Sequence, residues 1–287
     1  MIWMCPHCAQ PLEAGEPGLL CVNGHRFARA REGYVNLLPV QHKRSKNPGD
    51  NSEMVRGRRA LHQAQLYRPL AEALCDLVAT CRDVSTLLDI GCGEGYYDGM
   101  LSARLPGLSV YGVDIAKTAV RLAARDYRSQ HYAVASSRHL PVMTSSIDLA
   151  MCIFSPVNDS EVARAVRPNG YYLEVGPAAQ HLWELKTALY EQPREHPLLR
   201  RTIPGGALVQ EGECHYEKQL TQTELQAVVA ATPFAFRGHR EKREALREQS
   251  DFVITLGFSW RLFRLAALRD TVASGAVLDD ALESTDL

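Results

Sequence analysis

The stretch Asp89-Ile90-Gly91-Cys92-Gly93-Glu94-Gly95 decides the fold. It completes a short apolar run over residues 84–90 that is typical of a buried parallel strand, and a helical pattern over residues 96–105 follows it. A strand that ends in a glycine-rich turn and opens a helix is a nucleotide-cofactor signature, because glycines let the backbone approach a ligand closely. Tyr96 stands where a dinucleotide fingerprint needs its third glycine, and the loop carries no Walker lysine. The pattern therefore favours S-adenosylmethionine (SAM), which has no phosphate to bind.

Acidic and polar residues after the neighbouring strands support this prediction. Asp114 ends the second apolar run, 23 residues after Gly91, where a carboxylate can accept hydrogen bonds from both ribose hydroxyls. Asp89 is expected to anchor the loop or to approach the methionine amino group. Ser136 follows the third run, at the position of an adenine-contacting residue, although a turn or helix-cap role fits it equally well. The alternative is that the three glycines only form a tight turn and that the second acid caps a helix.

Apolar runs and helical patterns alternate along most of the chain, as in βαβ units. Strands are predicted over residues 84–90, 109–113, 132–135, 147–154 and 171–175. Helices are predicted over residues 96–105, 117–127, 159–166 and 180–190, with a turn at 168–170 before the fifth strand. Antiparallel strands at 214–220 and 252–260, with a helix at 222–231 between them, would close the sheet. The predicted fold is a Rossmann-like α/β domain of the class I SAM-dependent methyltransferases.

The N-terminal segment carries a metal-ligand pattern. Cys5, Cys8, Cys21 and His25 are spaced C-x2-C and C-x3-H with twelve residues between the pairs. Zn²⁺ prefers four tetrahedral sulfur and nitrogen ligands in structural sites, and four protein ligands leave no position open for water. We therefore predict a small zinc-binding module with a structural ion. His7 fits the spacing less well, and the alternative is a set of free thiols or a redox pair with unrelated cysteines.

Composition places limits on the class of protein. The chain has 287 residues, 46% of them hydrophobic, and a net charge of −1. It lacks a basic leader followed by an apolar run and any apolar run of the ~20 residues that span a bilayer, so no signal peptide, no membrane contact and a cytoplasmic location are expected. Four parts are predicted: residues 1–38 (zinc-binding module), 39–70 (basic linker and helix), 71–270 (methyltransferase domain) and 271–287 (acidic tail).

A local excess of positive charge marks the linker. Residues 41–70 hold seven Lys and Arg against two acids, although the whole chain is slightly acidic. Such a segment beside a zinc module is consistent with a phosphate-contacting surface, and a solvated helix face explains it equally well. The candidate RNA-contacting residues are Lys43, Arg44, Lys46, Arg56, Arg58 and Arg59.

These features together resemble the bacterial large-subunit ribosomal RNA guanine-N1 methyltransferases of the RlmA type, over nearly the whole chain. The most specific stretch is Glu32-Gly33-Tyr34-Val35-Asn36-Leu37-Leu38-Pro39-Val40-Gln41-His42-Lys43-Arg44-Ser45, followed by Pro48-Gly49-Asp50. The zinc ligands, the loop at residues 89–97, Ala135-Ser136-Ser137 and Pro233-Phe234 also match.

The resemblance implies SAM-dependent methylation of N1 of one guanine in a hairpin loop of 23S rRNA, with zinc on the N-terminal module, and it suggests a homodimer. It implies cofactor contacts from Gly93 and Glu94 and from the residues that match a family tyrosine and a family histidine, Tyr67 and His181. From the residues alone, Tyr67 is an amphipathic-helix residue and His181 a polar residue at a helix start. Residues 152–159 lack the Asn-Pro-Pro-Tyr motif of enzymes that methylate exocyclic amines, which fits a ring-nitrogen target.

Chemistry at guanine N1 requires a proton to leave before or during methyl transfer, so a general base or a stabiliser of O6 is expected. Asp159 or water could serve, but the sequence selects no catalytic residue. Two other functions fit parts of the pattern. One is a SAM methyltransferase for a small molecule or a protein, with the zinc module as a lid. The other is a catalytically silent zinc-ribbon RNA-binding protein, which the glycine loop and Asp114 argue against.

Overall fold

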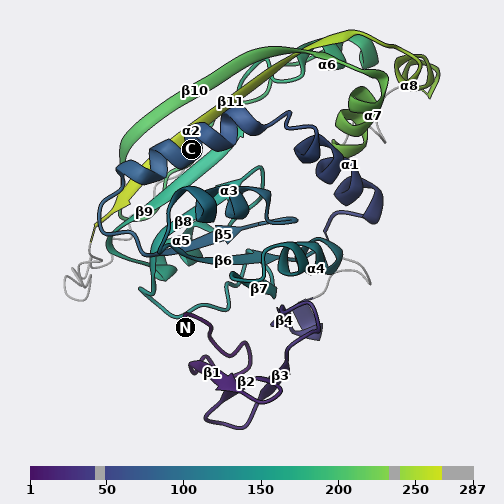
Figure 1. The fold of residues 1–287 in the computed structure, drawn as a ribbon. Coiled ribbons are helices and arrows are strands. Elements are labelled where there is room, and N and C mark those ends of the chain that lie inside the picture. Colours follow the sequence, from purple (N-terminus) through teal and green to yellow (C-terminus); the bar gives the residue numbers. More distant parts are fainter. Residues whose placement is uncertain (43–48, 233–239, 267–287) are drawn as a thin grey trace, which may run out of the picture.

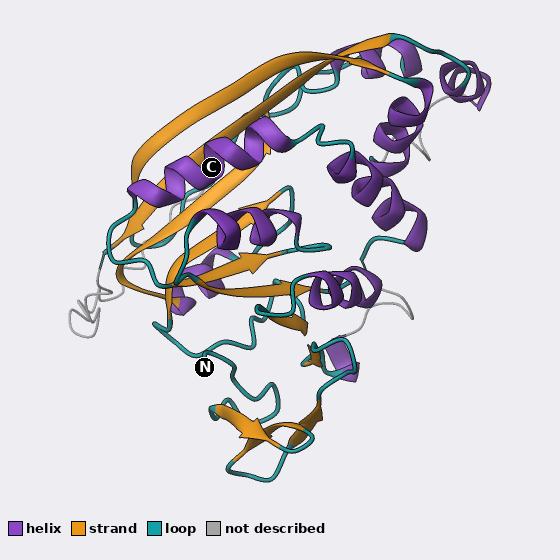
Figure 2. Cartoon of the chain, viewed as in Figure 1, coloured by secondary structure: helices purple, strands orange, loops and turns teal. Residues whose placement is uncertain are grey.

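The computed structural model describes residues 1–42, 49–232 and 240–266. Its described strands form a large mixed sheet and a small antiparallel sheet near the N-terminus (Figure 1). Figure 2 shows the helices packed around the large sheet, with the small sheet beyond one end of it. The predicted class, an α/β domain with a separate N-terminal ribbon, is confirmed at this level.

Five parallel strands form the centre of the large sheet. In spatial order they are β7 (His131–Val134), β6 (Ser109–Asp114), β5 (Thr86–Ile90), β8 (Ile147–Ile153) and β9 (Val166–Pro177). The strand order changes direction between β5 and β8. In open α/β sheets a ligand crevice lies outside the carboxyl ends of the strands at such a switch point.

Further strands extend the sheet on both sides. The antiparallel hairpin of β10 (Gly206–Leu220) and β11 (Phe252–Leu265) lies beside β9, and β4 (Val35–Asn36) pairs with β7 in parallel at the other edge. The N-terminal sheet consists of β1 (Leu12–Gly15), β2 (Gly18–Cys21) and β3 (Arg26–Ala28). Because β4 belongs to the large sheet, residues 35–36 connect the predicted zinc module directly to the methyltransferase domain.

Apolar side chains cover both faces of the sheet. Leu87 belongs to one core with α2 (Arg68–Thr80) and α3 (Tyr96–Arg104), whereas its neighbours Leu88 and Ile90 belong to a second core. This alternation follows from the two-residue period of a strand. The second core contains α5 (Asp159–Ala165) and Trp3 of the N-terminal segment. The N-terminal module is thus packed against the main sheet as well as joined to it.

The remaining helices lie around the large sheet (Figure 2). The α1 helix (Ser52–Gln63) packs closely on α7 (Gln222–Ala231). A Cβ added at Gly57 would lie only 2.7 Å from the backbone nitrogen of Ala231. Additional helices are α4 (Lys117–Asp126), α6 (Trp183–Leu189), α8 (Arg240–Arg247) and a short 3-10 turn at Val40–His42. Among the described residues, no helix is long and apolar enough to cross a membrane.

Several sequence predictions differ from the structure. The turn expected at residues 168–170 is absorbed into β9, which begins at Val166 and shifts register against β8 between Ile147 and Leu149. The hairpin strands β10 and β11 start earlier or end later than predicted, because their long-range pairing continues through residues with little apolar pattern. The acidic tail and Pro233-Phe234 lie outside the described residues.

Candidate functional site

The four predicted zinc ligands meet at one point. The Nδ1 atom of His25 lies 3.6 Å from the sulfur of Cys5, 3.5 Å from that of Cys8 and 3.3 Å from that of Cys21, and the sulfurs of Cys8 and Cys21 are 3.7 Å apart. A tetrahedron with Zn–S bonds of about 2.3 Å and a Zn–N bond of about 2.0 Å has edges of roughly 3.5–3.8 Å, so the donors fit zinc. His7 instead stacks on Phe27, at a ring-centroid distance of 5.8 Å.

The glycine loop connects β5 to α3 and needs its glycines for two different reasons. Gly91, Gly93 and Gly95 all have positive φ, at 86°, 55° and 80°. A Cβ at Gly91 would lie 2.2 Å from the hydroxyl oxygen of Ser155, so the loop after β8 presses directly on it. A Cβ at Gly93 would meet nothing within 4 Å, which leaves open space for a ligand beside the backbone. The loop thus provides the close backbone approach predicted for a cofactor site.

Two cavities lie along the carboxyl ends of the parallel strands. The first, of about 280 Å³, lies beside the glycine loop and the ends of β5, β8 and β9. The second, of about 570 Å³, lies at the ends of β6 and β7. Their shared lining residues make them one elongated cleft: Asp50, Arg58, Gly91, Ile153 and Phe154. An extended ligand with two different ends therefore fits the cleft better than a compact one.

Asp114 borders the second cavity at the end of β6. Its carboxylate accepts hydrogen bonds from the backbone N–H groups of Gly93, at 3.0 Å, and Ala116, at 2.7 Å. A carboxylate has about four lone-pair sites, so acceptor capacity remains for ribose hydroxyls. Ser136 also borders this cavity, and its hydroxyl accepts a hydrogen bond from the Arg138 backbone at 3.2 Å, so it is a turn residue at the predicted place.

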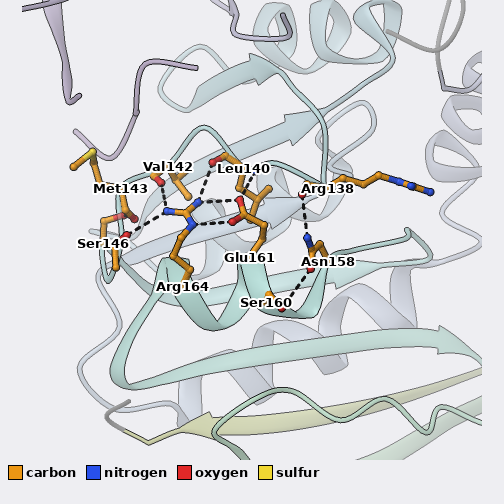
Figure 3. Close-up of polar contacts among 10 residues, drawn as sticks. Arg138, Leu140, Val142, Met143, Ser146, Asn158, Ser160, Glu161 and Arg164 are labelled. Atoms are coloured by element: carbon orange, nitrogen blue, oxygen red, sulfur yellow. Dashed lines mark hydrogen bonds and ion pairs between the residues drawn. The ribbon is translucent and has the colours of Figure 1, made fainter. Parts of the chain in front are cut away.

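A polar cluster fixes the loop that carries Ser136 (Figure 3). The Arg164 guanidinium on α5 donates to the carbonyls of Val142, at 2.7 Å, and Leu140, at 3.0 Å, and pairs with Glu161 at 2.8 Å. Glu161 in turn accepts from the Leu140 N–H at 2.7 Å. The α5 N-cap residue Asn158 donates to the Arg138 carbonyl at 3.1 Å. The loop over the second cavity is therefore held by α5, not left free.

Tyr67 and His181 meet in the first cavity, although 114 residues separate them. The Tyr67 hydroxyl lies 3.3 Å from His181 Nε2, and the Gly257 N–H donates to His181 Nδ1 at 3.3 Å. Burial lowers the pKa of His181 to about 3, so the ring is neutral. Since Nδ1 accepts, Nε2 carries the proton and donates to the Tyr67 oxygen, which leaves the tyrosine proton available to a ligand.

Asp89 and Asp98 form a buried acidic pair under the glycine loop. Asp89 is 2% exposed and Asp98, in the first turn of α3, is 0% exposed. Burial and the adjacent Asp98 carboxylate raise the pKa of Asp89 well above its usual range. Burial likewise raises the pKa of Asp98 to about 7. Two like charges in low dielectric cannot both ionise easily, so the pair retains a proton near neutral pH.

Replacing Asp98 with asparagine should stabilise the protein at alkaline pH. Between the ordinary pKa of 3.8 and about 7, the folded protein holds a proton that the unfolded chain has released, so the free energy of unfolding falls as pH rises. The variant should match the wild type near pH 4 and exceed it at pH 8, by at most about 4 kcal/mol at 1.36 kcal/mol per pKa unit. Urea unfolding at both pH values measures this, and an unchanged pH slope in the variant contradicts it.

Two arginines of the basic segment have acidic partners within the molecule. Arg58 pairs with Asp50 at 2.6 Å and borders the cleft, and Arg59 pairs with Glu94, at 3.3 Å, and Asp126, at 2.7 Å. Both arginines pair with acids of the same molecule, and their contact with RNA phosphate stays a prediction. Arg56 is exposed, as expected for such a contact. Lys43, Arg44 and Lys46 lie outside the described residues.

The structure also brings into the cleft residues that the sequence analysis did not identify as site residues. His196, on the segment between α6 and β10, borders the first cavity, and its Nε2 lies 3.2 Å from the His181 carbonyl. Phe154, which ends the predicted fourth strand, lines both cavities. Asp159 is engaged by Arg201 at 2.6 Å, so the acid named from the sequence as a candidate base already has a cationic partner.

Comparisons with known proteins agree with this geometry. Residues 3–46 match a zinc-ribbon family model described as "RlmA, N-terminal", and residues 87–170 match a model described as a methyltransferase domain. A 23S rRNA (guanine(748)-N(1))-methyltransferase of Streptomyces fradiae is 33% identical over 251 residues, which are 85% of this chain and 88% of that protein. The Bacillus subtilis (strain 168) protein named "Putative 23S rRNA (guanine-N(1)-)-methyltransferase YxjB" is 27% identical over 269 residues, 89% of this chain and 94% of that one. The predicted zinc ribbon and SAM-dependent methyltransferase fold are thereby confirmed.

Proposed function

The chain belongs to the RlmA family of 23S rRNA (guanine-N1)-methyltransferases, and from this premise we propose that it methylates N1 of one guanine in a hairpin loop of 23S rRNA. The observation that carries the proposal is the elongated cleft at the carboxyl ends of the strands. It combines a glycine loop open at Gly93, an acid at the end of β6 and an apolar chamber next to both. These are the parts needed to bind SAM and a base side by side.

The two ends of SAM fit the two ends of the cleft. The second cavity suits adenosine, because Asp114 has lone pairs left for the ribose hydroxyls and Ser136 lies where adenine would be. The first cavity suits the methionine part. There Asp89 lines the cavity and can accept from the amino group, with Asp98 buried behind it, and Tyr67 has a proton to donate to the carboxylate. Bound SAM supplies a methyl group on a positively charged sulfur.

A proton acceptor for guanine N1 is available in the first cavity. A carbonyl oxygen can only accept, so His196 Nε2 must carry the proton that it shares with the His181 carbonyl. Burial and nearby Lys186 lower the pKa of His196, which keeps the ring neutral and leaves Nδ1 with a lone pair. In the ranges that the structure describes, Nδ1 has no hydrogen-bond partner. We assign His196 as the general base, held in one tautomer by the carbonyl behind it.

The target is tested with 23S rRNA from a strain that lacks the modification. Incubation with the purified protein and SAM should produce a new N1-methyl stop in primer extension, and mass spectrometry should map it to one guanine. Asp114→Ala, which removes the ribose acceptor, serves as the inactive control.

Two results would replace the proposal with one of its rivals. SAM binding by calorimetry without any rRNA product would favour a small-molecule or protein substrate. RNA binding without SAM binding would favour a silent RNA-binding protein. Assembly as a homodimer, and action in the cytoplasm where ribosomes mature, stay predictions; light scattering tests the first and cell fractionation the second.

A further inference from the structure

Phe154 has a backbone conformation that its side chain does not favour. It follows β8 with φ at 55°, in the left-handed region that bulky residues rarely adopt. Its N–H donates to the Val175 carbonyl of β9 at 3.0 Å, and the next residue, Ser155, presses against Gly91. These contacts explain why the chain turns sharply at this point. They do not explain a large aromatic side chain, because asparagine or glycine would adopt this conformation with less strain.

The ring of Phe154 is also incompletely packed. The residue is 39% exposed, although it is large and apolar and lies in the middle of the cleft. Its ring centroid lies 6.1 Å from that of Tyr67, 5.8 Å from that of Phe258 and 6.3 Å from that of His181. The ring is thus supported by other rings and still presents surface to the cleft. Strained residues with exposed side chains concentrate at ligand sites.

The position of the ring fits a ligand that approaches the methyl group. Phe154 lines both cavities, so it lies where the two ends of the cleft meet. Ser155 links it to the glycine loop, and His181 links it to the wall that carries His196. A flat base lying on this ring would have the glycine loop at one edge and the proposed general base near another.

We propose that Phe154 is the stacking platform for the target guanine, an inference that rests on the proposed function. Protein recognition of a loop nucleotide uses aromatic faces on which the unstacked base lies. The strained backbone fixes the ring, and the ring fixes the plane of the base. N1 is then directed toward the methyl donor and not toward solvent.

The test compares four variants at Phe154 with a hairpin-loop fragment of 23S rRNA. Phe154→Trp and Phe154→Tyr keep an aromatic face, Phe154→Leu keeps an apolar side chain without one, and Phe154→Asn relieves the backbone strain. We expect tryptophan and tyrosine to retain kcat/KM for RNA within a few-fold. Leucine and asparagine should lower it about 5- to 150-fold, the range that corresponds to about 1–3 kcal/mol for one base–aromatic stack. Because Phe154 also lines the cavities assigned to SAM, SAM affinity is measured by calorimetry for all four variants, and the loss of kcat/KM for RNA in the leucine and asparagine variants should exceed any loss of SAM affinity.

Thermal melting separates this role from a structural one. Phe154→Asn should melt at or above the wild-type temperature while its RNA activity falls, because asparagine accepts the left-handed backbone. Leucine or asparagine variants as active as the wild type would overturn the platform and leave the proposed function intact. A wild-type protein that binds SAM but methylates no rRNA would instead overturn the proposed function, and the platform with it.

Discussion

Replacing Cys21 with serine should remove the zinc and loosen the whole N-terminal module. Cys21 is 3% exposed and shares a core with Trp3, Leu88 and Ile90, so its loss affects the main sheet as well as the ribbon. Binding of structural zinc is worth about 10–16 kcal/mol in small zinc modules and is coupled to their folding. If the folded protein loses several kcal/mol of this stabilisation by zinc, Tm should fall on the order of 10 °C for a domain of this size.

Metal content by mass spectrometry and thermal melting measure this effect together. Cys214→Ser is the matched control, because that thiol is also partly buried but lies on β10, far from the ligand cluster in sequence and outside it in space. The control should keep one zinc per chain and its melting temperature. A Cys21→Ser protein that still holds one zinc and melts like the wild type would show that the cluster is not a structural metal site.

The second large effect is expected from replacing His196 with glutamine. The glutamine amide keeps a donor for the His181 carbonyl but has no basic nitrogen, so position is preserved and proton transfer is lost. General acid–base catalysis contributes about 10²–10⁴-fold, and kcat at neutral pH should fall by roughly that factor. SAM affinity should change little. His215→Gln, on the exposed face of β10, is the control and should leave kcat unchanged.

The pH dependence of kcat in the same variant shows whether the loss of activity comes from lost proton transfer. Because burial lowers the pKa of His196, the wild-type ring is already neutral at pH 7, so the wild-type rate should fall only in acid. Guanine N1 loses its own proton at alkaline pH, where a general base is no longer needed. The ratio of the wild-type kcat to the kcat of His196→Gln should therefore decrease as pH rises. If kcat of the variant were reduced by the same factor at every pH, His196 would only position the segment that carries it.

Local patterns were sufficient for the parts of the fold that local chemistry determines. The helix predicted at residues 222–231 is α7 with the same bounds, because Thr221 caps it and Glu224 completes the capping box. The glycine loop and the zinc ligands were readable because both need particular residue types at fixed spacing. Asp114 lies at the predicted strand end for the same reason.

Long-range contacts determine the rest, and no short pattern carries them. The pairing of β4 with β7 joins residues about a hundred positions apart, and only two residues of β4 take part. Asp98 reads as an ordinary first-turn acid of a helix until the fold places it beside Asp89. Arg58 and Arg59 appear in the sequence as a basic run, and the acidic partners of Arg59, Glu94 and Asp126, come from other segments. His196 depends on a carbonyl fifteen residues away.

Because β4 pairs in parallel with β7, the N-terminal segment also covers an edge of the large sheet. Val35 and Asn36 pair with Ala133 and Val134, and the Leu37 N–H donates to the Val134 carbonyl at 2.9 Å. A chain shortened to begin at residue 39 would leave β7 as a bare edge, with backbone groups and apolar side chains open to other molecules. Unprotected edges of this kind recruit strands from neighbouring chains. Such a truncated protein should therefore aggregate, even though the glycine loop and Asp114 are intact.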